Sequence, residues 1–380
     1  MIYFDNSATT LPYKEAVDSF ITVTTKYFGN PSSLHGLGAQ AEKLLAQARK
    51  QAASLLEVKE QEIFFTSGGT EGNNIAIKGA ALANQSKGKH LIVSSIEHDS
   101  VKQAAEQMKE LGFEVTYLPV TESGHVEVEA LKNEMRPDTI LVSVMHVNNE
   151  MGAIQPIEEI GKLLKEYPKT LFHVDHIQGV GKVPLSLKGA GIDLCTISAH
   201  KFHGLKGTGA LYIREGANIF PLFSGGSQEK NIRSGTENVA GAVALAKALR
   251  MCLEASRSGN RHLKEISSFL RRGLEDIEGI RVNSPEHNCA PHILNFSVPG
   301  IKTEVLIHAL EEDGIYVSTT SACSSKRKAV SDTILMMTND EGLASSSIRI
   351  SLSYENTMEE AVEFLETIRA TLKKLKEVMG

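Results

Sequence analysis

The chain has 380 residues, of which 41% are apolar and 23% charged, with a formal net charge of −6. This length predicts two domains, or one large domain with a smaller partner. The chain is mildly acidic, so it lacks the excess of basic residues that is typical of proteins that bind nucleic acid directly. No stretch of about 18 consecutive apolar residues occurs, so we expect no transmembrane helix and no membrane partner.

The first residues, MIYFDNSATT, lack the basic start and the apolar stretch of a signal peptide. The four cysteines, Cys195, Cys252, Cys289 and Cys323, are scattered and form no CxxC pair. Such usage is typical of a reducing cytoplasm and argues against a disulfide framework or a structural zinc site. We therefore expect a cytoplasmic protein without a metal site.

The first clear element is an amphipathic helix predicted over residues 39–58. From about residue 60 to 215, short apolar runs then alternate with helical patterns. The runs that predict buried strands are EIFFT (62–66), HLIVSS (90–95), FEVTYLPV (113–120), TILVSVMHV (139–147), LFHVD (171–175), LCTIS (194–198) and GALYI (209–213). This alternation predicts an α/β fold whose mostly parallel central sheet carries helices on both faces.

A long, largely apolar helix is predicted next, over residues 236–256, and would connect two lobes. The remainder has mixed strand and helix signals, which indicate a smaller α+β domain. Its last helix is marked by a capping box of Thr357 and Glu360. We therefore expect a large domain at 15–256 and a small domain formed by 1–14 and 257–380.

Ligands of parallel α/β sheets bind at the carboxyl ends of the strands, so the residues there are functional candidates. SGGTEGNN (67–74) follows the run at 62–66 and would let backbone N–H groups approach an anion at a helix N-terminus. It is neither a GxGxxG nor a Walker A loop, so it does not indicate a dinucleotide or a nucleoside triphosphate. A tight turn of turn-forming residues explains this stretch equally well.

Four further strand ends carry polar side chains. His98 has a ring that can stack on a flat cofactor or move a proton, and Asn149 has an amide that can orient a substrate or cap a helix. Asp175 emerges from an apolar strand, where a carboxylate is costly unless it is paired or caps a helix. Lys201 follows the run at 194–198, and desolvation there would favour the neutral amine that imine formation needs.

These residues together match the requirements of pyridoxal 5'-phosphate. Lys201 would form the Schiff base, and Asp175 would keep the ring nitrogen protonated. The turn at 67–71 would hold the phosphate, and His98 would lie against the ring. Each group is placed at the end of a predicted strand, so the four converge on one site.

Blocks along nearly the whole chain resemble the cysteine desulfurases, which are class V aminotransferase-like enzymes of pyridoxal-phosphate fold type I. The blocks are YFDNSATT, FGNPSSLH, FTSGGTEGNN, IEHDSV, MHVNNEMG, HVDHIQGVGK, SAHKFHGLKGTGALY, RSGTEN, SACSS and SSIRISL. The resemblance implies conversion of L-cysteine to L-alanine, with the sulfur transferred to an enzyme cysteine as a persulfide and on to an acceptor protein. It also implies a homodimer with its sites at the subunit interface.

The resemblance further implies a role for each matching residue. The cofactor would be held by Gly69, Thr70, His98, Asp175, Gln178, Ser198, His200 and Lys201, and by Thr236 of the other subunit. Asn149 and Arg349 would bind the substrate carboxylate, because the guanidinium fork matches a carboxylate bidentately. Lys201 would remove the Cα proton, His98 would assist proton transfer, and Cys323 would be the nucleophile.

Cys323 lies in TTSACSSKRKAV (319–330), among small and polar residues. The basic residues at 326–328 either favour its thiolate by proximity or form a solvated charge run. The long spacing from Cys323 to SSIRISL resembles the subgroup with a long catalytic loop.

The sequence departs from the family pattern at two places. One lies beside a predicted cofactor contact, and the other concerns which protein accepts the sulfur. His176 stands beside Asp175 where the family usually has a small residue, so we expect it to crowd the pocket or interact with the carboxylate. The chain ends at Gly380, so we expect no long C-terminal tail of the kind that docks iron–sulfur scaffold proteins. The acceptor would then belong to tRNA thiolation or the thiamine pathway, with iron–sulfur cluster synthesis as the family's other route.

Three other functions stay open. The first is a pyridoxal-phosphate aminotransferase or lyase that needs no thiol. The second is a metal hydrolase built on His173, Asp175, His176, His200 and His203, although no HExxH motif occurs. The third is a non-enzymatic sulfur carrier, which would need neither Lys201 nor Asp175.

Overall fold

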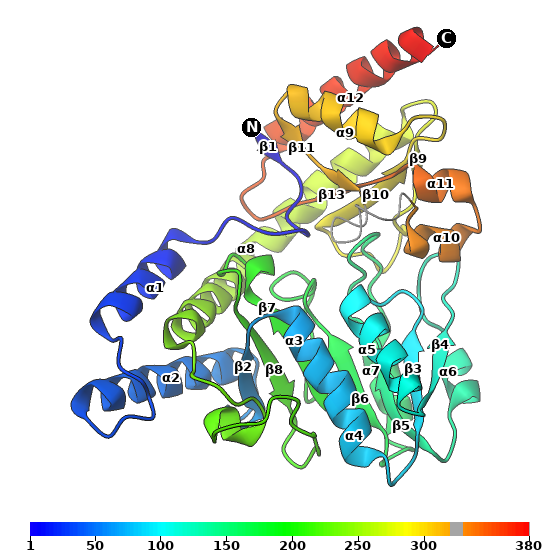
Figure 1. Cartoon of the computed structure of the whole chain (residues 1–380). Helices are drawn as coiled ribbons and strands as arrows, with labels where there is room; N and C mark the ends of the chain where they lie inside the picture. The colour runs from blue at the N-terminus through cyan, green and yellow to red at the C-terminus, as the bar shows by residue number, and fades with distance from the viewer. Residues whose placement is uncertain (320–329, 380) are drawn as a thin grey trace.

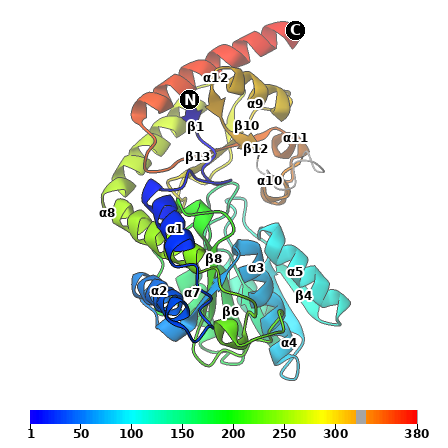
Figure 2. The same ribbon diagram turned by 60° about the vertical axis from the view of Figure 1, so that its left-hand side comes forward.

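The computed structural model describes residues 1–319 and 330–379 (Figure 1). A large body surrounds a seven-stranded sheet, and a smaller body surrounds a four-stranded sheet. Each body has its own buried apolar core. Helix α8 (Val239–Glu275) runs through both bodies and contributes residues to both cores (Figure 2).

The large sheet contains every strand predicted between residues 62 and 213. In spatial order the strands are β2 (Ile63–Thr66), β8 (Gly209–Ile213), β7 (Leu194–Ser198), β6 (Leu171–Asp175), β5 (Thr139–Ser143), β3 (His90–Ser94) and β4 (Glu114–Leu118). Strand β8 is antiparallel to both neighbours, and the other pairs are parallel. The predicted mostly parallel α/β sheet is therefore confirmed, although β5 ends four residues before the predicted end at 147.

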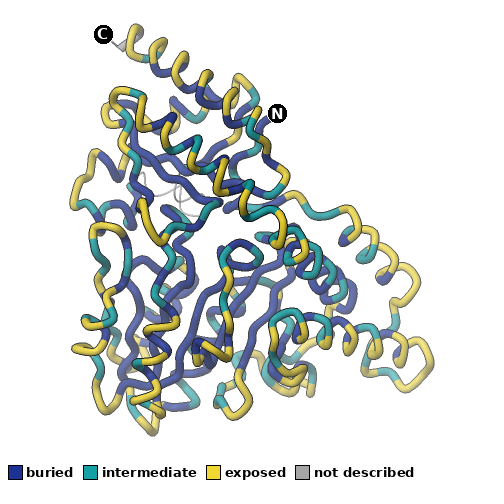
Figure 3. Tube along the Cα trace, turned by 180° about the vertical axis from the view of Figure 1, so that it is seen from behind, coloured by how far each residue is buried: buried dark blue, intermediate teal, exposed yellow. Residues whose placement is uncertain are grey.

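Neighbouring residues along the central strands mostly contribute to two different cores, because side chains alternate between the faces of a sheet. On β3, Leu91 and Val93 join one core and Ile92 joins the other. The first face is covered by α3 (Gly69–Asn74), η2 (Ile75–Gly79), α4 (Ala80–Asn84) and α5 (Asp99–Glu110). The second is covered by α6 (Val128–Glu134), α7 (Ile157–Leu164) and the first half of α8. Figure 3 shows the strands as a largely buried interior.

The small body is built from both ends of the chain. Its four-stranded sheet is antiparallel, in the order β12 (Ser318–Thr319), β13 (Ser347–Ser351), β10 (Ile293–Ser297) and β9 (Arg281–Val282). Strand β1 (Ile2–Tyr3) pairs in parallel with β11 (Ile315–Tyr316). The helices of this body are α9 (Thr303–Glu312), α10 (Asp332–Thr338), α11 (Glu341–Ser345) and α12 (Met358–Met379).

The remaining elements are α1 (Lys14–Lys26), α2 (Gly36–Leu55), η1 (Glu60–Glu62), η3 (Ala199–Lys201) and η4 (Gln228–Asn231). Helix α2 is the helix predicted over 39–58. The predicted capping box is confirmed at the start of α12, where Glu360 N–H donates to Thr357 Oγ1 (3.3 Å) and Thr357 N–H donates to Glu360 Oε2 (3.0 Å).

Helix α8 is longer than the helix predicted over 236–256, and the proposed domain boundary at 256 lies inside it. Leu263, Ile266 and Leu270 continue its buried stripe into the core of the small body. Gly259 interrupts this pattern in the sequence, but a Cβ at that position would lie 2.4 Å from the ring of Tyr354. The glycine therefore reflects close packing and does not end the helix.

Candidate active site

The loops after β2, β3, β5, β6 and β7 meet at one edge of the large sheet, beside the small body (Figure 1). Strands β2 and β7 are each antiparallel to β8, so they point the same way, and β7, β6, β5 and β3 are parallel. Their carboxyl ends therefore share an edge, where parallel sheets bind ligands.

A cavity of about 440 Å³ lies at the start of α3, and most of the predicted phosphate-binding residues line it. Its walls include Gly69, Thr70, Ser198 and His200, together with Lys206. The first N–H groups of a helix have no intrahelical acceptor, so they and the Lys206 cation suit an anion. Gly68 has a φ of +148°, a conformation that favours glycine, and it lets the chain turn into this helix.

Lys201 ends η3, directly after β7, and its Nζ donates to two backbone carbonyls of the N-terminal segment. The acceptors are Ser7 O and, at 2.9 Å, Ala8 O. Gln178 Nε2 donates to the same Ser7 carbonyl at 3.1 Å. The N-terminal segment therefore joins these two predicted cofactor contacts.

Asp175 ends β6 and is buried. Its Oδ2 accepts a hydrogen bond from Asn73 Nδ2 (2.8 Å), and its Oδ1 accepts one from Ile177 N–H (3.0 Å). Burial raises the pKa of Asp175, and the Ile177 N–H, His98, Asn73 and Lys201 oppose that rise. A protonated ring nitrogen would oppose it further, because an opposite charge favours the carboxylate.

His98 is the N-cap of α5. Its Nδ1 accepts from Ser100 N–H at 3.1 Å and lies 2.8 Å from Ser100 Oγ. Asn73 Nδ2, which donates to Asp175, also donates to Ser100 Oγ (2.9 Å), so His98 and Asp175 are joined through two side chains. Lys201 follows β7, the strand paired with β6, so the three predicted cofactor contacts lie at one edge.

Arg349, on β13 of the small body, reaches the same edge and is buried. Its Nη1 donates to the backbone carbonyl of Asn149 (2.9 Å), which brings the two predicted substrate ligands together. Its Nη2 donates to Asp5 Oδ1 (3.0 Å) and Ser318 Oγ (2.9 Å). Arg349 Nε is buried and has no hydrogen-bond partner among the described residues, so it is a donor suited to a ligand carboxylate.

Two predicted residues are not placed in this cluster. Thr236 is exposed and is not among the residues that line the 440 Å³ cavity. Its loop is held to the cavity wall by the ion pair of Arg233 Nε with Glu71 Oε1 (2.8 Å). Cys323, like the basic residues at 326–328, lies outside the described residues.

His176 bonds to another histidine. Its Nδ1 lies 2.8 Å from Nδ1 of His146, and the described partners of the Asp175 carboxylate are Asn73 and Ile177. Burial lowers the pKa of both rings, in His146 to about 4. Gly179 makes room for this pair, since a Cβ there would lie 2.5 Å from His146 Nδ1. Of the two effects expected of His176, a bond to the carboxylate is therefore not seen.

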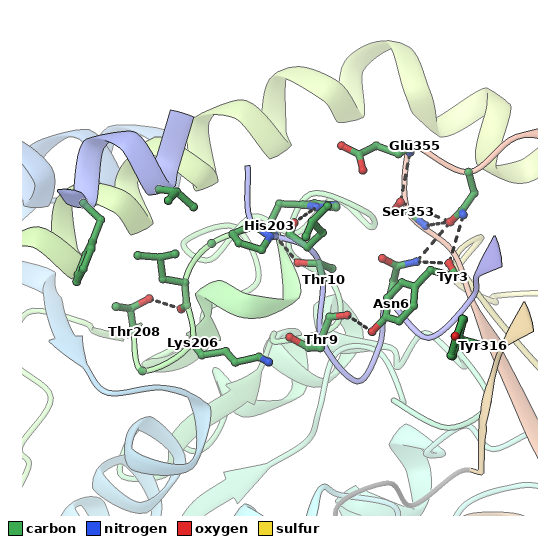
Figure 4. Close-up of a pocket in the computed structure, with 18 of the residues that line it drawn as sticks. Tyr3, Asn6, Thr9, Thr10, His203, Lys206, Thr208, Tyr316, Ser353 and Glu355 are labelled. Carbon is green, nitrogen blue, oxygen red and sulfur yellow. Dashed lines mark hydrogen bonds between the residues drawn. The ribbon is translucent and has the colours of Figure 1, made fainter. Parts of the chain in front are cut away.

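A second cavity, of about 1110 Å³, lies beside the site between the N-terminal segment, the loop at 203–208 and the small body (Figure 4). Among the described residues, none of those predicted for pyridoxal-phosphate chemistry lines it, and His203 is the only member of the alternative metal set that does. Within residues 1–319 and 330–379, no group of three or more His, Cys, Asp and Glu side chains is arranged to hold a metal ion, and no helix is long and apolar enough to cross a membrane.

The residues present fit pyridoxal phosphate. A Cβ at Gly69 would lie 2.3 Å from Ile177 Cδ1, so a larger residue there would require the Ile177 side chain to move. An amine, a buried carboxylate, an imidazole and an anion cradle surround one strand edge, as this cofactor requires.

Four contributors to the cluster were missed from the sequence: Asp5, Ser7, Asn73 and Ser100. Asn73 and Ser100 belong to the quoted blocks FTSGGTEGNN and IEHDSV, and both are buried despite being polar. Asp5 and Ser7 belong to YFDNSATT, a block to which no role was attached. A polar residue inside a motif block was the available signal.

The model of the family described as aminotransferase class-V matches residues 2–364 of this chain. A NifS/IcsS protein homolog of Lactobacillus delbrueckii subsp. bulgaricus is 47% identical over 367 residues, covering 96% of this chain and 95% of that protein. Cysteine desulfurase IscS of Dictyoglomus turgidum is 42% identical over 378 residues, covering 99% and 96%. A solved structure described as a NifS-like protein has a TM-score of 0.92 and 38% identity, covering 98% of this chain and 99% of that one.

Proposed function

This chain belongs to the aminotransferase class-V family, and we propose that it is a pyridoxal-phosphate-dependent cysteine desulfurase. It converts L-cysteine to L-alanine and moves the sulfur to Cys323. The observation that carries the proposal is the convergence of Lys201, Asp175 and His98 with a buried arginine donor at one strand edge. The relative from Dictyoglomus turgidum carries this activity in its name.

The cofactor, when bound, supplies an electron sink that weakens the bonds at the substrate Cα. Lys201 would hold it covalently, Asp175 would lie at its ring nitrogen, and Gln178 at its ring hydroxyl. The cavity residues Gly69, Thr70, Ser198 and His200 would hold the phosphate. Burial and the neighbouring Lys201 and Lys206 lower the pKa of His200 to about 4, so at neutral pH its ring carries no charge.

Arg349 and Asn149 orient the substrate. The unpartnered Nε of Arg349 donates to the substrate carboxylate, while Asp5, Ser318 and the Asn149 carbonyl hold the other guanidinium nitrogens in place. A guanidinium fixed before the substrate arrives loses less conformational entropy on binding.

Lys201 would move the proton at Cα, because its amine is released when the substrate takes its place on the cofactor. His98 moves a proton as sulfur leaves the substrate. Cys323 thiolate attacks that sulfur, and the electron pair of the broken C–S bond ends in the C–H bond formed at Cβ. The balance is L-cysteine plus Cys323–SH giving L-alanine plus Cys323–S–SH.

The sulfur then passes from Cys323 to an acceptor protein of tRNA thiolation, the thiamine pathway or iron–sulfur cluster synthesis. The enzyme works as a homodimer in which Thr236 serves the partner's site. Large apolar side chains support a second copy, since several near the N-terminal helices and the loop before Thr236 are exposed. They include Leu11, Ile21, Phe28, Leu34, Phe220 and Phe223.

The test is to supply the purified chain with pyridoxal phosphate and L-cysteine and measure L-alanine, sulfide and protein-bound sulfur. Cys323→Ala should abolish sulfide and persulfide, whereas Cys289→Ala, a matched change outside the site, should leave them unchanged. An aminotransferase would be insensitive to Cys323→Ala. Radiolabelled sulfur on Cys323 then identifies the acceptor, and a chain that releases no alanine refutes the proposal.

A further inference from the structure

The geometry points to Ser100 and Asn73 as positioning residues for His98. Together they join the Asp175 carboxylate to the His98 imidazole and hold neutral His98 with its proton on Nε2. Both residues lie outside the set to which a role was given above. The inference rests on the proposed function, because it concerns the ring that moves a proton there.

Asn73 provides the first link. It is completely buried, and its Nδ2 donates to Asp175 Oδ2 at 2.8 Å and to Ser100 Oγ at 2.9 Å. The carboxylate only accepts hydrogen bonds, so it fixes which end of the Asn73 amide is the nitrogen. Both amide protons are thereby used, and Ser100 Oγ must act as an acceptor toward Asn73.

Ser100 provides the second link. Because its Oγ accepts from Asn73, its own hydroxyl proton is available for His98 Nδ1, which lies 2.8 Å away. The Ser100 backbone N–H donates to the same Nδ1 at 3.1 Å. An imidazole nitrogen that faces two donors must be the unprotonated one, so the proton of neutral His98 is on Nε2.

The arrangement has a chemical consequence. Nδ1 accepts from Ser100, so neutral His98 presents Nε2–H to the site as a donor. Asp175, which would lie at the cofactor ring nitrogen, and His98, which would lie on the ring face, are held in one hydrogen-bonded row. A change at Ser100 should therefore alter proton transfer without altering how tightly L-cysteine binds.

The direct measurement is ¹⁵N NMR of the cofactor-loaded protein labelled at histidine, before any substrate is added. His98→Gln identifies the signals of the ring. We expect Nδ1 in the position of an unprotonated, hydrogen-bonded nitrogen and Nε2 protonated. In Ser100→Ala the Nδ1 signal should move toward that of a nitrogen accepting fewer hydrogen bonds, and Ser100→Thr, which keeps the hydroxyl, should restore it.

Turnover gives the second measurement. Loss of one hydrogen bond in the proton-transfer step should lower kcat for alanine formation by about 3- to 10-fold in Ser100→Ala with KM unchanged. Ser123→Ala is the matched control, because it removes a remote serine hydroxyl that lies 3.0 Å from His125 Nδ1. It should change neither signal nor rate.

A protonated Nδ1 in the unmodified protein would overturn the inference, as would equal effects of Ser100→Ala and Ser123→Ala. A rise in KM that matches the fall in kcat would also count against it. These outcomes differ from a failure of the proposed function, in which the unmodified protein itself releases no alanine.

Discussion

The two ends of the active site are built in different ways. At the cofactor end, His98, Asp175 and Lys201 each follow a strand of one sheet, so the strand order alone brings them together. At the substrate end, Arg349 is held by residues from three distant segments: Asp5, Asn149 and Ser318. The chemistry therefore depends on one rigid sheet, whereas substrate recognition depends on how the small body meets it.

The largest effect should come from the cofactor end. Lys201→Ala should lower alanine formation at least about 10³-fold, because it removes both the covalent attachment and the amine that moves the Cα proton. Mass spectrometry after borohydride reduction should find the cofactor on Lys201 in the unmodified chain and no adduct in the variant. An adduct on another lysine would show that this end of the site is wrongly assigned.

The next effect should come from the substrate end. Arg349→Gln removes the charged donors and should lower kcat/KM by roughly 30- to 100-fold, mostly through KM. The cofactor adduct at Lys201 should persist, and this persistence is what separates the two ends. Loss of cofactor binding in this variant would mean that the small body also supports the cofactor.

The change of the free energy of unfolding with pH tests how deeply Glu97 is buried at the cofactor end. Burial raises the pKa of Glu97, next to His98, to about 8, although Ser94 Oγ donates to its Oε1 at 2.6 Å. The folded chain then holds a proton that the unfolded chain releases above about 4.5, so this carboxyl lowers stability as pH rises from about 4.5 to 8. Glu97→Gln should reduce that slope, by at most about 1.4 kcal/mol per pH unit. Urea unfolding at several pH values measures it, and parallel curves would contradict the assignment.

Substitutions of Asp5 should have a smaller effect. They test whether Asp5 acts on Arg349 by orienting the guanidinium or by its negative charge. Asp5→Ala removes one of the two acceptors of Arg349 Nη2 and leaves Ser318 Oγ. It should raise KM for L-cysteine about 3- to 10-fold, the value of roughly one hydrogen bond. Asp5→Asn keeps an oxygen toward the guanidinium and should stay within about two-fold. If both variants behave alike, the carboxylate charge matters and the positioning does not.

The smallest effect should come from His176, which bonds to His146 behind the cofactor end. His176→Ala should change kcat and KM by less than about two-fold. The reason is that the described hydrogen-bond partners of the Asp175 carboxylate are Asn73 and Ile177, not His176. The absorption band of the bound cofactor should also keep its position. A shifted band would show that His176 tunes the cofactor after all.

The sequence predicted the cofactor end better than the substrate end, for a physical reason. Short apolar runs and the polar residues that follow them are local signals, so the sheet and the positions of Asp175 and Lys201 at its strand ends were predictable. Asp5 and Ser318 bond to Arg349 across 344 and 31 positions of the chain, and no local pattern contains such a contact. The length of α8 was missed because Gly259 serves packing against Tyr354, which only the fold reveals.

Strand β1 has a consequence for how the protein is made. Ile2 and Phe4 lie in the core of the small body, and Ile2 pairs with Ile315, which the ribosome adds 313 positions later. At about 5–20 residues per second, these apolar residues wait on the order of 15–60 s for their partners. During synthesis the large body can fold from contiguous chain, whereas the small body can close only near the end of translation. A growing chain thus exposes its first strand to chaperones for most of its synthesis.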